Sequence, residues 1–249
     1  MNGGWLGSDM KNAYQKLVRC KSTDCLTARM YDRRDGNHVR DAWVYDLYLS
    51  DQVMRDGAPT EHIRINVRRD EFTEPKAREL AEEAAKSVGR MPFALRWNVD
   101  TVTINDGNKP WGGGNRDLLI HEEWSQGYRD FWEGNIYDET MVHEAGHTSM
   151  DVMIHKGMCE EYEQAVLADG LFISDYATSN PMTCEGTGGH SEDVPESFVV
   201  YIGSRLKNNG MLPEKREMYN RVIYSRFALF DSIMATKTNG VDNFSPYSP

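Results

Sequence analysis

Two histidines and a glutamate near the middle of the chain have residue types and a spacing that could bind and use a metal ion. Residues 141–151 include the run His143-Glu144-Ala-Gly-His147, a His-Glu-x-x-His pattern. Residues four apart lie one turn from each other on one face of a helix, so the two imidazoles can hold one zinc ion. Glu144 would then lie beside the metal, where its carboxylate can take a proton from a water molecule. The alternative is a pair of surface or core histidines that bind no metal.

A catalytic zinc ion needs a third protein ligand, and the histidine helix does not supply it. Position 153, where an extended pattern would place a third histidine, is Met, and His155 lies too far along the helix to share the ion. Glu192 and Glu196 are four apart on one face of an expected helix. We expect Glu192 to bind the metal and Glu196 to accept a hydrogen bond from one histidine, although the roles could be exchanged. Two surface carboxylates would give the same pattern.

Together these two motifs resemble those of the gluzincin-type zinc metallopeptidases. Residues 138–206 are similar to the catalytic domains of anthrax lethal factor and the bacterial Pro-Pro endopeptidases, in which a Tyr precedes a helix whose first Glu binds zinc. The resemblance implies that Tyr176 lines the site and stabilises the oxyanion of the reaction. The gap between Tyr176 and Glu192 is longer than in those relatives, and Pro195 replaces their usual Ala.

Two further residues are alternatives for these roles. His190 is a second candidate for the group that stabilises the oxyanion, because an imidazole can donate a hydrogen bond there as a tyrosine hydroxyl can. Gly186-Thr187 followed by Asp193 resembles the Gly-Thr-x-x-Asp element of aspzincins, although with a different spacing. Asp193 is therefore a minor candidate for the metal ligand.

A glycine-rich segment is the candidate for substrate binding. Zincins bind an extended peptide along an edge strand, which is a form of strand addition. We expect this edge in residues 111–115 and 117–120, where glycines allow a close approach of the backbone. The expected contacts are Trp111, Gly112, Gly113, Gly114 and Leu119. A simple hairpin loop would have the same composition.

The helices and strands expected around these residues indicate an α+β fold. Alternating residues predict a strand at 62–68, and an apolar stripe predicts a helix at 73–89 that begins at Thr73 and stops at Gly89. Asn135 or Asp138 could cap the histidine helix. Further strands are expected near 42–49, 93–99, 100–104 and 117–121, and further helices at 159–168, 191–206 and 213–233. The resemblance implies one zincin-like domain, 1–249, with an upper lobe of mixed sheet and helices (about 1–150) and a mainly helical lower lobe (about 151–249).

Charge and cysteine content limit the compartment and the partners. The net charge of −11 argues against nucleic-acid binding, and no apolar run is long enough to span a membrane. The four cysteines pair most economically as Cys20–Cys25 and Cys159–Cys184. With the sequon at Asn243, they favour a secreted protein over a cytosolic one with unpaired cysteines, although no signal peptide is visible in the first thirty residues.

These observations predict a zinc-dependent endopeptidase that acts on a peptide or protein substrate. One catalytic Zn²⁺ would activate water, and Glu144 would be the general base. Two alternatives are a catalytically silent zincin-like binding or toxin-associated module, and a zinc hydrolase of a non-peptide bond. The intact Glu144 argues against the silent module. The sequence predicts neither a cleavage-site preference nor an oligomeric state.

Overall fold

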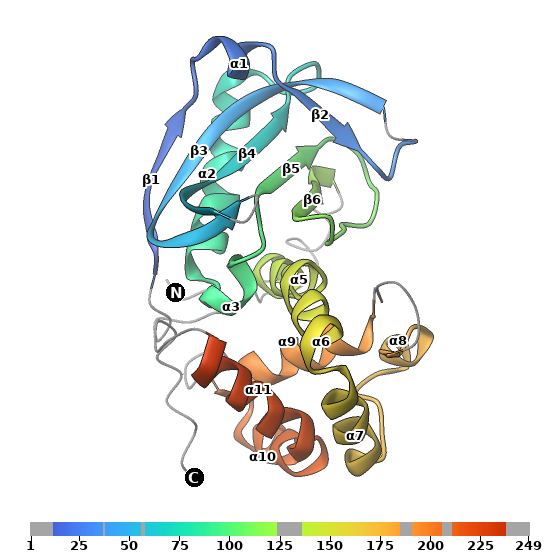
Figure 1. The fold of residues 1–249 in the computed structure, drawn as a ribbon. Helices are drawn as coiled ribbons and strands as arrows, with labels where there is room; N and C mark the ends of the chain where they lie inside the picture. The colour runs from blue at the N-terminus through green and yellow to red at the C-terminus, as the bar shows by residue number, and fades with distance from the viewer. Residues whose placement is uncertain are drawn as a thin grey trace.

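A mixed β-sheet forms the upper part of the molecule in Figure 1. The computed structural model describes residues 12–36, 38–55, 58–123, 136–184, 191–205 and 211–237, and in them six strands form this sheet. Strands β1, β3 and β4 are antiparallel neighbours, β4, β5 and β6 are parallel neighbours, and β2 pairs with β3. The bounds are β1 Tyr14–Arg19, β2 Arg29–Asp32, β3 His38–Arg55, β4 Ala58–Arg68, β5 Thr101–Asn105 and β6 Asp117–His121. The strands predicted at 42–49, 62–68, 100–104 and 117–121 are confirmed, as is the α+β class.

Helix α2 (Glu74–Arg90) packs on the sheet through its predicted apolar stripe. The stripe is fully buried and consists mostly of alanines, which let the helix approach the strands closely. It comprises Ala77, Leu80, Ala81, Ala84, Ala85 and Val88. Thr73 occupies the N-cap position, but its side chain makes no capping hydrogen bond. The helix continues one residue past the predicted stop at Gly89.

Two predictions for the part of the chain that precedes His143 are wrong. Residues 93–96 form a short helix, α3 (Phe93–Arg96), where a strand was predicted over 93–99. The reason is tertiary: the buried guanidinium of Arg96 donates to both carboxylate oxygens of Asp51, at 2.5 and 2.7 Å, which holds this turn against β3. Asp138 is not an N-cap but lies inside α5 (Ile136–Ala145), where Ser87 and Arg90 bind its buried carboxylate. Asn135, the other predicted cap, lies outside the described residues.

The chain after the motif is helical, as predicted. It forms α6 (Asp151–Gly157), α7 (Cys159–Asp169), α8 (Asp175–Ser179), α9 (Asp193–Arg205), α10 (Pro213–Val222) and α11 (Tyr224–Lys237). Helix α7 ends at Gly170, whose φ of 71° is in the left-handed region that favours glycine. The single long helix predicted at 213–233 is wrong, because Ile223, between α10 and α11 in the chain, leaves helical geometry and is fully buried.

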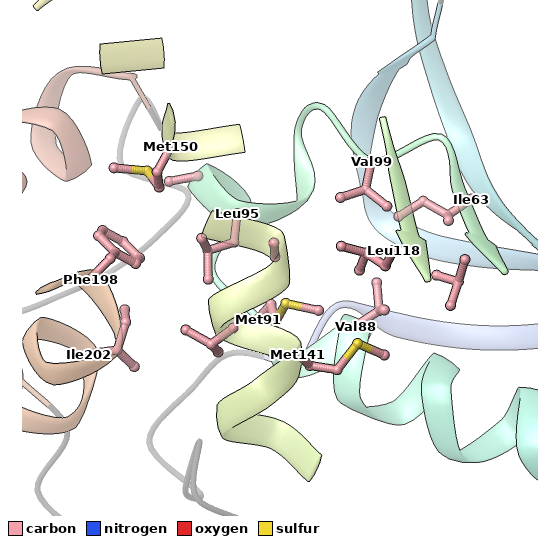
Figure 2. Close-up of a cluster of buried hydrophobic side chains, with 14 of the residues drawn as sticks. Ile63, Val88, Met91, Leu95, Val99, Leu118, Met141, Met150, Phe198 and Ile202 are labelled. Carbon is pink, nitrogen blue, oxygen red and sulfur yellow. The ribbon is translucent and has the colours of Figure 1, made fainter. Parts of the chain in front are cut away.

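The histidine helix lies between the sheet and these later helices (Figure 1). Helix α5 continues into a π-helical turn, η1 (Gly146–Met150), and then into α6. Figure 2 shows Met141 of α5 and Met150 of η1 in one apolar cluster with residues of both parts of the molecule. The cluster includes Ile63, Val88, Leu95 and Leu118 on the sheet side and Phe198 and Ile202 of α9. One core therefore fixes the histidine helix from both sides.

Both predicted cysteine pairs lie at disulfide distance. Cys20 joins Cys25 within the short helix α1 (Thr23–Leu26), and Cys159 at the start of α7 joins Cys184, which follows α8. Among the described residues, no helix combines the length and the apolar character that a membrane span requires.

Candidate metal centre

His143, His147 and Glu192 bring three potential metal ligands to one point. The Nε2 atoms of the two histidines each lie 3.2 Å from Oε2 of Glu192. One ligand atom from each of the three residues lies within 4.8 Å of the other two, so the group could hold a metal ion. The sequence-predicted combination of two histidines and Glu192 is therefore present in the structure as one cluster.

The outer nitrogen of each imidazole faces a carboxylate. Nδ1 of His143 lies 3.1 Å from Oε1 of Glu196, and Nδ1 of His147 lies 3.0 Å from Oδ2 of Asp151. Because a carboxylate only accepts hydrogen bonds, each Nδ1 carries the proton. Both Nε2 atoms are then left to face Glu192. This is the arrangement by which proteins orient histidine ligands toward a metal.

The convergence of these atoms requires a positive charge between them. With both imidazoles neutral, two nitrogen lone pairs and a carboxylate oxygen would point at one another. Glu192 Oε2 is also buried without a well-formed hydrogen bond. Two imidazole nitrogens and one carboxylate oxygen are a donor set that suits a divalent transition metal, so the residues fit such an ion.

The pKa shifts of these side chains have the same cause. Burial by itself would lower the pKa of both histidines, but the adjacent carboxylates outweigh it. They raise the pKa of His143 to about 10, through Glu192 and Glu196, and also raise that of His147, through Asp151 and Glu192. Burial opposes ionisation of Glu192, yet the two histidines hold its pKa below the usual range. The group favours positive charge at its centre, whether from a proton or from a metal.

Close packing between η1 and α9 brings Glu192 to the histidines. A Cβ atom on Gly146 would lie 3.0 Å from both Cα and Cβ of Pro195, so the missing side chain lets the first turn of α9 approach the histidine helix. Backbone N–H groups then fix the residues before α9: Ser191 N donates to Asp151 Oδ2 at 3.0 Å, and Glu192 N donates to the carbonyl of Asn180 at 2.8 Å.

Asp193, the minor candidate ligand, does not belong to the metal-binding group. Its side chain is fully buried and accepts a hydrogen bond from Nη1 of Arg226 at 2.9 Å. The alternative in which Asp193 replaces Glu192 as a ligand is therefore not supported by the arrangement.

Tyr176 lies beside the cluster on the short helix α8. Its ring centre is 6.1 Å from that of His143, and the side chain is 55% exposed, so it can reach both the site and solvent. Burial and the neighbouring Glu192 raise the pKa of its hydroxyl to about 12 in the metal-free protein. Ser174 caps α8 and donates to Glu196 Oε2 at 2.9 Å, which ties this helix to the cluster. His190, the alternative to Tyr176, lies outside the described residues.

Glu144, the predicted general base, is 8% exposed at the centre of the motif. Its negative charge adds to the larger effect of Glu192 in raising the pKa of His143 and of Tyr176. Its backbone carbonyl accepts a hydrogen bond from Thr148 Oγ1 at 3.0 Å. Glu144 is not one of the three grouped ligands.

The glycine-rich segment runs along the outer edge of β6. Gly112 pairs with Leu119 in antiparallel fashion through two backbone hydrogen bonds of 3.0 and 2.8 Å. The guanidinium of Arg33 donates to the carbonyl of Gly112 at 2.9 Å. The side chains of Trp111 and Leu119 are buried in the protein, so these two predicted contacts could reach a substrate only through their backbone.

The same segment packs directly against the histidine helix. A Cβ atom on Gly113 would overlap the carbonyl oxygen of Glu144 and lie 2.8 Å from Cβ of His147. The N–H of Gly114 donates to Thr148 Oγ1 at 2.8 Å. Gly113 therefore brings the backbone of this segment into close contact with the histidine helix at Glu144 and His147.

Sequence reasoning missed Asp151, although it lies four residues after His147 and so on the same helical face. That spacing was the available signal. Ser174 and Arg226 gave no comparable signal, since they reach the site only through contacts between distant helices. Comparison of the chain with models of protein families, with curated proteins and with solved structures finds no match.

Proposed function

We propose that the protein is a zinc-dependent endopeptidase of the gluzincin type. The observation that carries the proposal is the convergence of His143, His147 and Glu192. The Nε2 atoms of both histidines lie 3.2 Å from Glu192 Oε2, and Glu144 lies on the same helix as the histidines. A site that only bound metal would have no need of Glu144. The His-Glu-x-x-His motif and the downstream Glu192 thus lie next to each other in space.

The donor set favours zinc over the other abundant divalent ions. Calcium and magnesium prefer oxygen ligands, whereas two imidazoles and one carboxylate are a zinc set that leaves a position open for water or substrate. When bound, the ion would polarise the attacking water and the scissile carbonyl.

Four residues of the chain have proposed roles in proton transfer, oxyanion stabilisation and histidine orientation. Glu144 takes a proton from the attacking water and delivers it to the leaving amine. Tyr176 donates a hydrogen bond to the carbonyl oxygen as negative charge develops on it. Glu196 and Asp151 keep the two imidazoles oriented and protonated on Nδ1. These roles are proposed from position and residue type.

The backbone of residues 112–114 supplies a surface for an extended peptide. It pairs with the edge of β6 at Leu119 and lies against the histidine helix, so a peptide bound along it would pass the metal centre. In this interpretation the sheet and α2 form an upper lobe and α6–α11 a lower lobe. The two disulfides are consistent with an extracellular protein, and we infer that it is secreted.

A diverse peptide library tests this function. Zinc-loaded protein is incubated with the library, and new termini are identified by mass spectrometry, in parallel with the variant Glu144→Gln. We expect cleavage by the wild type and no cleavage by the variant, with equal zinc content in both. Stoichiometric zinc without any Glu144-dependent cleavage would refute the peptidase and favour a binding module or a hydrolase of another bond.

A further inference from the structure

Glu192, just before α9, and the first turn of α9 supply two pairs of polar residues that face in different directions. Glu192 and Glu196 face the histidines, whereas Asp193 and Ser197, one position further along, face Arg226 of α11. Neighbouring residues on a helix project about 100° apart, so the direction of one pair fixes the direction of the other. Whatever holds the second pair therefore also sets how the first pair meets the metal.

Arg226 holds the second pair with a fully buried guanidinium. Nη1 donates to Asp193 Oδ1 at 2.9 Å and to Ser197 Oγ at 3.0 Å. Nε donates to Asp169 Oδ2 at 2.9 Å, and Nη2 donates to the carbonyl of Leu171 at 2.5 Å. One side chain thus connects α11 with the end of α7 and the start of α9.

The geometry points to the Asp193–Arg226 ion pair as a positioning device for the metal ligand Glu192. Three consecutive residues are anchored to three different elements: Ser191 to Asp151, Glu192 to the carbonyl of Asn180, and Asp193 to Arg226. Of these three contacts, only the last involves a side chain within α9, so it acts directly on how that helix is rotated about its own axis. Through it the terminal helix sets the affinity of the site for zinc. The inference rests on the proposed metal centre but not on peptidase activity.

Two matched variants separate positioning from stability. Asp193→Asn and Asp169→Asn each remove one buried carboxylate from the same arginine, but only Asp193 adjoins the ligand. The dissociation constant for zinc is measured by competition with a chromophoric chelator, and the melting temperature is measured on the metal-free forms. Both variants should melt lower than the wild type. Asp193→Asn should weaken zinc binding about 10-fold or more, whereas Asp169→Asn should change it by less than about twofold.

The outcomes distinguish the positioning role from the metal centre itself. Equal zinc affinities for the two variants would overturn the positioning role. Should Asp193→Asn not fold, Ser197→Ala tests the same face of α9 with a smaller change, for which we expect about threefold weaker zinc binding; an unchanged affinity would overturn the inference. A wild type that binds no zinc would overturn the metal centre and this inference together, whereas zinc binding without cleavage would leave the inference standing.

Discussion

Nδ1 of His147 lies 3.0 Å from Oδ2 of Asp151, and the same oxygen accepts a hydrogen bond from the backbone N–H of Ser191. One buried carboxylate therefore orients a ligand histidine and fixes the residue that precedes the third ligand. This contact joins the histidine motif to a segment more than forty positions away (191 − 147 = 44). It explains how two motifs far apart in sequence meet with ligand atoms 3.2 Å apart.

Asp151→Asn should weaken zinc binding about 10-fold, because the neutral amide stabilises the orientation of His147 less than the carboxylate does. The measurement is a chelator competition assay on the purified variant. Glu160→Gln, which removes an exposed carboxylate of α7, is the control for a general effect of charge. Zinc binding by Asp151→Asn as tight as that of the wild type would show that Asp151 has no orienting role.

Glu192 and Glu196 should differ in their effect on metal binding. Glu192→Ala removes the atom that faces both Nε2 groups and should abolish tight zinc binding. Glu196→Ala removes only the partner of His143 Nδ1 and should weaken binding about 10- to 100-fold. Isothermal titration with zinc ranks the two variants, and each serves as the control for the other. The opposite ranking would assign the ligand to Glu196.

Gly113→Ala should disturb both stability and the metal site. The new methyl group would overlap the carbonyl oxygen of Glu144, so the segment or the histidine helix must move, at a cost of about 1–3 kcal/mol in the free energy of unfolding. Denaturant unfolding and zinc titration measure the two effects. Gly157→Ala, on α6, is the control, because nothing lies within 4 Å of its added Cβ. Equal behaviour of the two variants would show that the close approach at Gly113 is unimportant.

Tyr176→Phe should reduce turnover and leave metal binding intact. The ring is 55% exposed, so loss of the hydroxyl should not affect folding. If this hydroxyl stabilises the oxyanion, kcat/KM for a cleaved peptide should fall about 100-fold. Tyr224→Phe, with an exposed tyrosine on α11, is the matched control. Full activity of Tyr176→Phe would transfer the oxyanion role to another group, of which His190 is the first candidate.

Local patterns in the sequence were sufficient for the parts of the site that depend on helical spacing. The four-residue intervals His143–His147 and Glu192–Glu196 predicted which side chains share a face, and the structure brings both pairs to one cluster. The apolar stripe of α2 and the two short cysteine loops were also predictable, because each is a feature of a continuous segment.

The errors arise where a distant partner decides the local structure. Arg96 turns its segment into a helix because it binds Asp51, and Asp138 is buried inside α5 because Ser87 and Arg90 bind it. Arg226 approaches Asp193 only after α9 and α11 have packed together. No periodicity within any one of these segments encodes such contacts.

The central claim is that His143, His147 and Glu192 hold one zinc ion. Crystals of the zinc-loaded protein, with diffraction measured on both sides of the zinc absorption edge, test it most directly. We expect one anomalous peak within bonding distance of His143 Nε2, His147 Nε2 and the carboxylate of Glu192. A zinc-loaded crystal with no peak at these residues, or with its peak at other side chains, would contradict the claim.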